Sequence, residues 1–193
     1  MAGVPTNFQA ISNVLPTYNF VDIASGTGYV NFYAGTTVDK MALSNFTYYS
    51  DTIYASTTDD DYDVLLNRPM DLKGLGIVNV PVYIDRNGNP STTAHVTVKL
   101  RKWDGSTETE IVSNDSTTLL NASTAAYYMQ AVDLVIPLTH FKIGETLRLT
   151  IQIVFDRGIM YYGHDPQNRS TDWDTTGAVP SRLSFQCPVR LNL

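Results

Sequence analysis

Residues 141–155 read FKIGETLRLTIQIVF, and this stretch decides the fold class. From Leu147 to Phe155 the odd positions are apolar, and the even positions are polar except for Val154. A period of two is typical of a β-strand with one buried face, whereas a helix turns by about 100° per residue and would mix the two sets on every face. The stretch therefore predicts a half-buried strand.

The same alternation recurs along the chain, in residues 78–84, 94–100, 132–138 and 183–193. Between the first two of these, the Asn87-Gly88 pair predicts a tight hairpin, because both central residues of a type I′ turn need a positive φ. Pro81 cannot donate a ladder hydrogen bond, so it indicates an edge strand or a bulge. We expect 141–155 to pack against 132–138, whose inward face would carry Val132, Leu134, Ile136 and Leu138, and against 183–193.

Short strands separated by turn residues, with no helical period in the second half of the chain, predict an all-β fold. A chain of 193 residues is long enough for one sizeable core. We predict a two-sheet antiparallel β-sandwich with jelly-roll topology. The single domain is expected to span residues 17–193, after an N-terminal arm of residues 1–16 that shows no sustained period.

The charge of the chain argues against some partners. The formal net charge is −6 and the pI is about 4.8, whereas a nucleic-acid phosphate backbone requires clustered Lys and Arg. Met1–Pro5 is not a basic segment leading into an apolar one, and no apolar run is long enough to cross a bilayer. We therefore expect no nucleic-acid partner, no membrane partner and synthesis in a cytoplasm. The single cysteine, Cys187, excludes an internal disulfide, and its place in an alternating run predicts burial.

One acidic stretch has the spacing of a metal loop. Asp59, Asp61 and Asp63 match the first ligands of a calcium loop. However, Val64 occupies the position that needs Gly, and Met70 occupies the position that needs Glu. We predict a solvated polar loop, and the sequence leaves open an adventitious cation there.

The sequence suggests no catalytic residues. His95, His140 and His164 have no metal-binding spacing. His164-Asp165 offers a base beside a carboxylate, but neighbouring residues on an extended chain point to opposite sides, and no nucleophile motif accompanies them. We predict that His164, Asp165 and Pro166 form a structural corner, that there are no catalytic, cofactor-binding or metal residues, and that the chain is not an enzyme.

Aromatic residues leave two functions open. Trp103, Trp173, Tyr161 and Tyr162 could stack on sugar rings or pack in a core or an interface. A carbohydrate- or receptor-binding β-sandwich module is therefore the alternative to an assembly protein.

Four segments carry a family resemblance: DIASGTGYV at 22–30, FKIGE at 141–145, GHDP at 163–166 followed by Asn168-Arg169, and LSFQCPVRLNL at 183–193. Together they resemble virion proteins of tailed phages that are encoded near the major capsid protein. The resemblance implies a structural protein of the particle, of the decoration, cement or minor capsid type, and it provides no catalytic residues. The expected partners are the major capsid protein and further copies of the chain, with a trimer as one arrangement. The expected location is the virion.

Overall fold

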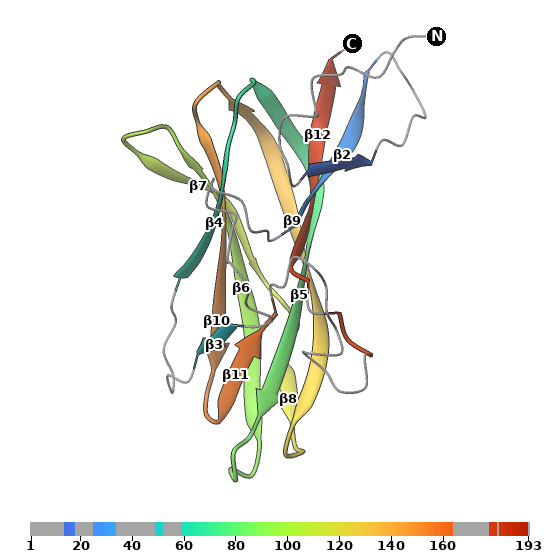
Figure 1. The fold of residues 1–193 in the computed structure, drawn as a ribbon, viewed down its shortest axis with the longest axis vertical. Helices are drawn as coiled ribbons and strands as arrows, with labels where there is room; N and C mark the ends of the chain where they lie inside the picture. The colour runs from blue at the N-terminus through green and yellow to red at the C-terminus, as the bar shows by residue number, and fades with distance from the viewer. Residues whose placement is uncertain are drawn as a thin grey trace.

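The computed structural model describes residues 14–17, 25–33, 49–51, 59–163, 178–180 and 182–192. Its strands form two antiparallel sheets packed face to face (Figure 1). The first sheet has the order β1 (Val14–Thr17), β2 (Ser25–Tyr33), β12 (Ser184–Asn192), β5 (Met70–Asp85), β11 (Ile159–Tyr162) and β3 (Tyr49–Asp51), and β9 (Ala126–Phe141) pairs with the other edge of β5. The second has the order β4 (Asp59–Leu65), β10 (Thr146–Phe155), β6 (Thr92–Trp103) and β7 (Glu108–Asp115), and β8 (Leu119–Asn121) also pairs with β6. The predicted all-β two-sheet sandwich is confirmed.

The long strands follow jelly-roll topology. In the first sheet, β2, β12, β5 and β9 are successive neighbours, and in the second sheet β4, β10, β6 and β7 are. Counted along the chain from one to eight, these strands have the orders 1-8-3-6 and 2-7-4-5, which is the arrangement of a double-sheet jelly roll. The connections therefore bring β2 and β12, the first and last of these eight strands, side by side.

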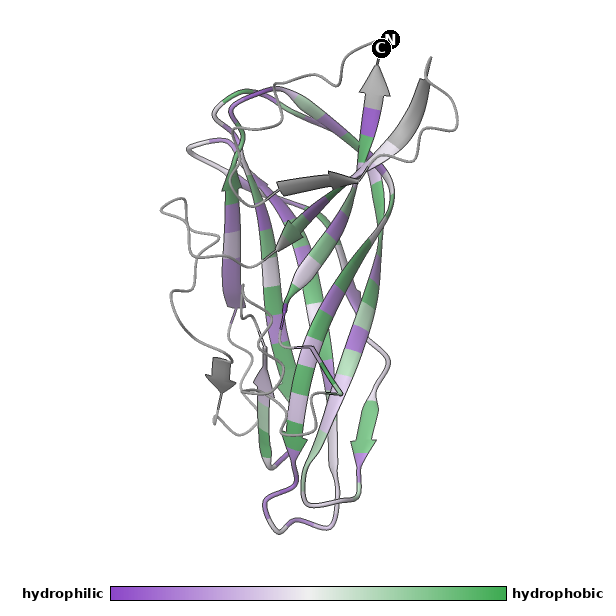
Figure 2. Cartoon of the chain, turned by 45° about the vertical axis from the view of Figure 1, so that its right-hand side comes forward, coloured by the Kyte–Doolittle hydropathy of each residue, from purple (hydrophilic) through white to green (hydrophobic). Residues whose placement is uncertain are grey.

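The core lies between the sheets, where the alternating apolar faces meet (Figure 2). In β10, Ile151 and Ile153 are 0% and 1% exposed, as the alternation predicts. The hydrogen-bonding partners of β10 are β4 and β6. The stretches 132–138 and 183–193, expected to pack against it, belong to the opposite sheet and contribute to the same buried cluster.

Pro81 does not mark an edge strand, so that prediction is wrong. It lies in β5, which pairs with β9 on one edge and with β12 and β11 on the other. The β12 pairs end at Asn79 and the β11 pairs begin at Val82. The Pro81 carbonyl, which accepts a hydrogen bond from Gly163 N (2.8 Å), points toward this edge. The backbone nitrogen of Pro81, which has no hydrogen to donate, therefore faces the gap between β12 and β11.

The hairpin predicted from Asn87-Gly88 is confirmed. The φ angles of Asn87 and Gly88 are 47° and 81°, and Asn89 N donates to Arg86 O at 3.0 Å. At the other end of the chain, β1 pairs with β2 and crosses the boundary predicted for the N-terminal arm at residue 16.

Candidate functional site

Asp59, Asp61 and Asp63 lie on β4, so the prediction of a solvated loop is wrong. Because side chains alternate along a strand, all three carboxylates project from one face, while Tyr62 and Val64 are buried on the other. Antiparallel pairing places these aspartates opposite β10, whose outward side chains include the cation Arg148.

The central contact of this face is between Arg148 and Asp63, which are paired across β10 and β4. Arg148 Nε and Nη2 each lie 2.7 Å from an Asp63 carboxylate oxygen. Such a two-pronged geometry is the strongest arrangement of a guanidinium and a carboxylate. Next along the strands, Thr150 Oγ1 donates to Asp61 at 2.6 Å. The neighbouring carboxylates raise the pKa of Arg148, with the Asp63 hydrogen bonds as the main cause.

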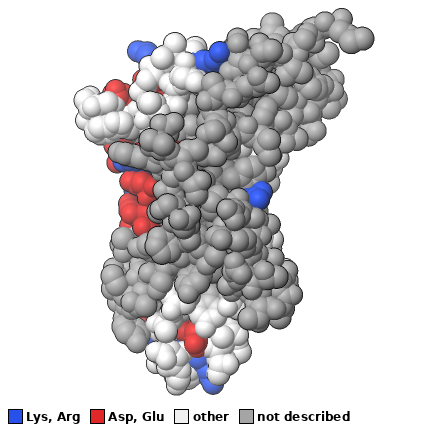
Figure 3. Space-filling view, in the orientation of Figure 1, with Lys and Arg blue, Asp and Glu red and all other residues white. Residues whose placement is uncertain are grey.

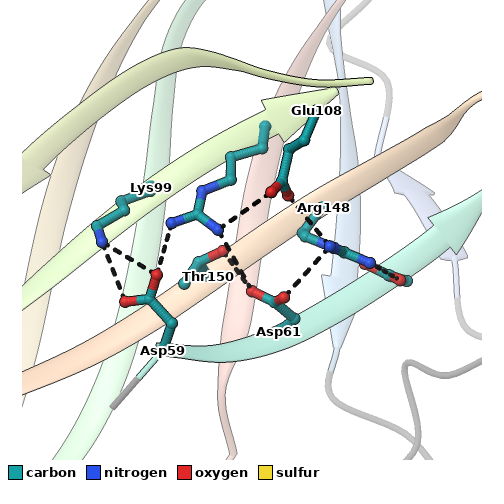
Figure 4. A network of polar contacts seen from close by, with 8 residues as sticks. Asp59, Asp61, Lys99, Glu108, Arg148 and Thr150 are labelled. Atoms are coloured by element: carbon teal, nitrogen blue, oxygen red, sulfur yellow. Dashed lines mark hydrogen bonds and ion pairs between the residues drawn. The ribbon is translucent and has the colours of Figure 1, made fainter. Parts of the chain in front are cut away.

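The network continues onto β6 and β7 (Figure 4). Asp59 accepts from Lys99 Nζ at 3.0 Å and from Arg101 Nη2 at 2.6 Å. Glu108 accepts from Arg148 at 3.1 Å and lies 3.6 Å from Arg101. Partial burial by itself would raise the pKa of Asp59, but Arg101 and Lys99 hold it below its usual value.

These contacts explain the acidic stretch without a metal. Each of Asp59, Asp61 and Asp63 already has an Arg, Lys or Thr partner, and the three side chains project in a row instead of converging on one point. Within the described ranges, no group of three or more His, Cys, Asp or Glu side chains could hold a metal ion. The network is a cross-strand clamp on the outer face of the second sheet.

The two described histidines lie on different sheets. His140 Nδ1 lies 2.6 Å from Asp71 Oδ1, in a cross-strand pair of β9 and β5. His95 lies on β6 opposite Val154 of β10. The predicted corner of His164, Asp165 and Pro166 lies outside the described residues.

Tyr161, one of the candidate sugar-stacking residues, belongs to a ladder of three rings across β9, β5 and β11. The Tyr83 ring lies 4.9 Å from the Tyr127 ring and 5.2 Å from the Tyr161 ring, centroid to centroid. Burial, followed by the nearby Asp85 carboxylate, raises the pKa of Tyr83 to about 12. Because Tyr83 has a ring on each side, both of its faces are occupied within the protein.

The other aromatic candidates have different positions. Tyr162 is buried in the core, where its hydroxyl lies 2.7 Å from that of Tyr62 and links the two sheets. Trp103 is half-buried at the end of β6, and Trp173 lies outside the described residues. Cys187 is fully buried, as predicted, and burial raises the pKa of its thiol.

An exposed apolar surface lies on the outer face of β5 and β9. Leu75 and Val135 are directly paired across the strands and are 44% and 74% exposed. The pairing register then shifts, so that Pro137 and Leu138 together oppose Lys73. This bulge turns Leu138 outward, with 56% of its surface exposed. We call the surface of Lys73, Leu75, Val135 and Leu138 the bulge face.

The sequence did not indicate the bulge face. Strict alternation from Val132 predicts that Leu138 points into the core, and the structure contradicts this because the extra residue changes the phase. Pro137 was the available signal, since a proline inside a long strand is found at edges and bulges. A contiguous apolar surface beside polar neighbours is typical of a binding site.

No family model and no curated protein matches the chain. It is similar to a crystal structure of a CocE/NonD family hydrolase from Staphylococcus aureus, with 11% identity and a TM-score of 0.44, covering 92% of this chain and 37% of that one. A second structure of a CocE/NonD family hydrolase from the same organism has 10% identity and a TM-score of 0.40, covering 92% and 36%. The chain thus spans little more than a third of the length of these neighbours.

The prediction that the chain is not an enzyme is contradicted by these two hydrolases, and we withdraw it. Their likeness, at such identities and TM-scores, assigns no activity to this chain. Among the described residues, no helix has the length and apolar character needed to cross a membrane.

Proposed function

We propose that this chain is a structural protein of a virus particle, of the decoration, cement or minor capsid type, located in the virion. It binds the major capsid protein through the bulge face and associates with further copies of itself. The observation that carries the proposal is the pair of Leu75 and Val135, two apolar side chains held side by side and open to solvent on a rigid sheet.

The fold is compatible with this role. Double-sheet jelly rolls occur in viral capsid proteins, but also in lectins and cupins, so the fold supports the proposal only by analogy. The cross-strand clamp of Arg148 and Asp63 stabilises the second sheet, and the Tyr62–Tyr162 hydrogen bond ties that sheet to the first. A rigid scaffold of this kind presents a binding surface with little ordering entropy to lose. The carbohydrate- or receptor-binding alternative stays a prediction, which a glycan array tests.

Co-sedimentation with particles assembled without this chain tests the proposal. We expect the wild type to bind, and the Leu75→Thr/Val135→Thr variant to bind about tenfold more weakly, about 1.4 kcal/mol. Threonine keeps the branched shape that suits a strand while making the surface polar. Leu120→Thr is the matched control, because Leu120 is 65% exposed on β8. A wild type that does not bind, or a double variant that binds as the wild type does, would refute the proposal.

A further inference from the structure

The charges around the bulge face indicate what kind of surface it meets. Most of the described Lys and Arg side chains form ion pairs or hydrogen bonds, as they do in the clamp on β4, β6 and β10. Within the described part of the chain, neither an ion pair nor a hydrogen bond engages the side chains of four cations, Arg68, Lys73, Lys142 and Arg190.

The β4–β5 turn, the β9–β10 turn and the adjoining ends of β5 and β12 hold these four cations, and these segments lie at the upper end in Figure 1. Arg68 is in the turn between β4 and β5, and Lys142 is in the turn between β9 and β10. Leu66 N donates to Glu145 O at 2.9 Å, and Gly144 N donates to Leu66 O at 2.8 Å, so the two turns are held together. This end therefore carries four cations without an ion-pair partner among the described residues, in a chain whose net charge is −6.

The other two cations are on the outer face of the first sheet. Lys73 lies across from the bulge, and Arg190 follows Val189, which pairs with Leu72 of β5. Lys73 is two residues from Leu75 on the same face, and Arg190 lies nearer the end of the sheet. Figure 3 shows Lys and Arg atoms at the upper end, with a few acidic atoms close to them and a larger acidic group farther down.

Two acidic groups at this end have side-chain partners. Asp71 is paired with His140 at 2.6 Å. Glu145 accepts from Lys102 Nζ at 2.6 Å and from the Lys142 backbone N at 2.7 Å. The Lys102 ammonium holds the pKa of Glu145 below its usual value.

On the outer face of the first sheet, Asp133, two residues before Val135, is an exposed carboxylate near the apolar row. The β6–β7 hairpin, which the pairing of Trp103 with Thr146 places at this same end, adds Asp104 and Glu110, two exposed carboxylates without an ion pair among the described residues.

We propose that the outer face of the first sheet, at this end of the sandwich, docks on an acidic protein surface, with Leu75 and Val135 at the centre of the contact and Lys73 and Arg190 at its rim. The inference rests on the proposed function and specifies the chemistry of the capsid surface that is recognised. An apolar centre with a polar rim is the usual anatomy of a protein interface.

Binding to particles assembled without this chain, measured at about 50 mM and about 500 mM NaCl, tests the inference. Charges at the rim of an interface mainly govern association and its salt dependence. We expect wild-type affinity to fall at least about tenfold at the higher salt, and Lys73→Glu/Arg190→Glu to lose at least about tenfold at the lower salt with a flatter salt dependence. Arg157→Glu, which changes a charge that is 50% exposed in the turn between β10 and β11, is the control and should stay within about twofold.

The outcomes separate the two proposals. Binding that is insensitive to salt and unchanged in Lys73→Glu/Arg190→Glu would overturn the acidic partner and leave the proposed function standing. Failure of the wild type to bind at either salt would overturn both. Self-association in sedimentation equilibrium that is lost in the double variant would assign the surface to a second copy. Wild-type binding to phosphatidylserine vesicles, again lost in the variant, would assign it to a membrane, and either result would overturn the inference.

Discussion

Replacing Gly158 with alanine should destabilise the sandwich strongly. Gly158 ends the turn through which the chain passes from β10, in the second sheet, to β11, in the first. Its φ is +86°, and a Cβ placed there would clash with Asp85 O and lie 2.9 Å from Thr92 Oγ1. Asp85 ends β5 and Thr92 begins β6, so the carbonyl cannot move without disturbing the hairpin between them.

Two terms contribute to the expected loss. A left-handed backbone costs an alanine about 1–2 kcal/mol, and forcing extra volume into a packed site costs about 1–3 kcal/mol. The sum is about 2–5 kcal/mol, which lowers Tm by about 4–20 °C for a chain of this size. Gly88 is the matched control, because its φ is +81° and a Cβ there would meet nothing within 4 Å. Gly88→Ala should therefore show only the first term.

Urea denaturation of both variants, followed by circular dichroism, provides the measurement. Gly158→Ala should have the lower midpoint by an amount equivalent to about 1–3 kcal/mol. Equal midpoints for the two variants would show that the turn is not packed against the β5–β6 hairpin and would refute the reasoning.

Three further predictions concern charge and burial. In a double-mutant cycle, Arg148→Met and Asp63→Asn should show a coupling of about 1 kcal/mol in the free energy of unfolding, because their bidentate pair is partly shielded from solvent. A coupling near zero would contradict a clamp. Asp59 and Glu145 have pKa values below their usual ones in the folded chain, so the unfolded chain binds more protons and stability decreases as pH falls. The urea midpoint should therefore drop between about pH 5 and pH 2, and a flat profile would count against these ion pairs. The Cys187 thiol, fully buried and with a raised pKa, should react with a disulfide reagent at pH 8 only as the chain unfolds, whereas rapid reaction of the native chain would disprove its burial.

Local patterns were sufficient for the strands and the hairpin. Alternation depends only on neighbouring residues, so β6, β10 and β12 were predicted with their buried faces correct. The Asn87-Gly88 turn was equally local, because the requirement for positive φ belongs to the two residues themselves.

The candidate surfaces depend on contacts between distant parts of the chain. The clamp requires Asp63 of β4 to lie opposite Arg148 of β10, 85 residues later, and no local pattern specifies that register. When the cations on the neighbouring strands are not known, a run of aspartates is typical of a loop. This is why a solvated loop was wrongly predicted for Asp59, Asp61 and Asp63.

Composition and periodicity alone thus established an all-β, acidic chain with one buried face per strand, since burial of apolar side chains follows directly from the alternation. Tertiary structure decided which strands pair, where the bulge turns Leu138 out to solvent, and which cations lack partners. These features arise from register and sheet order, and both depend on the energy of the whole packed sandwich and on no single segment.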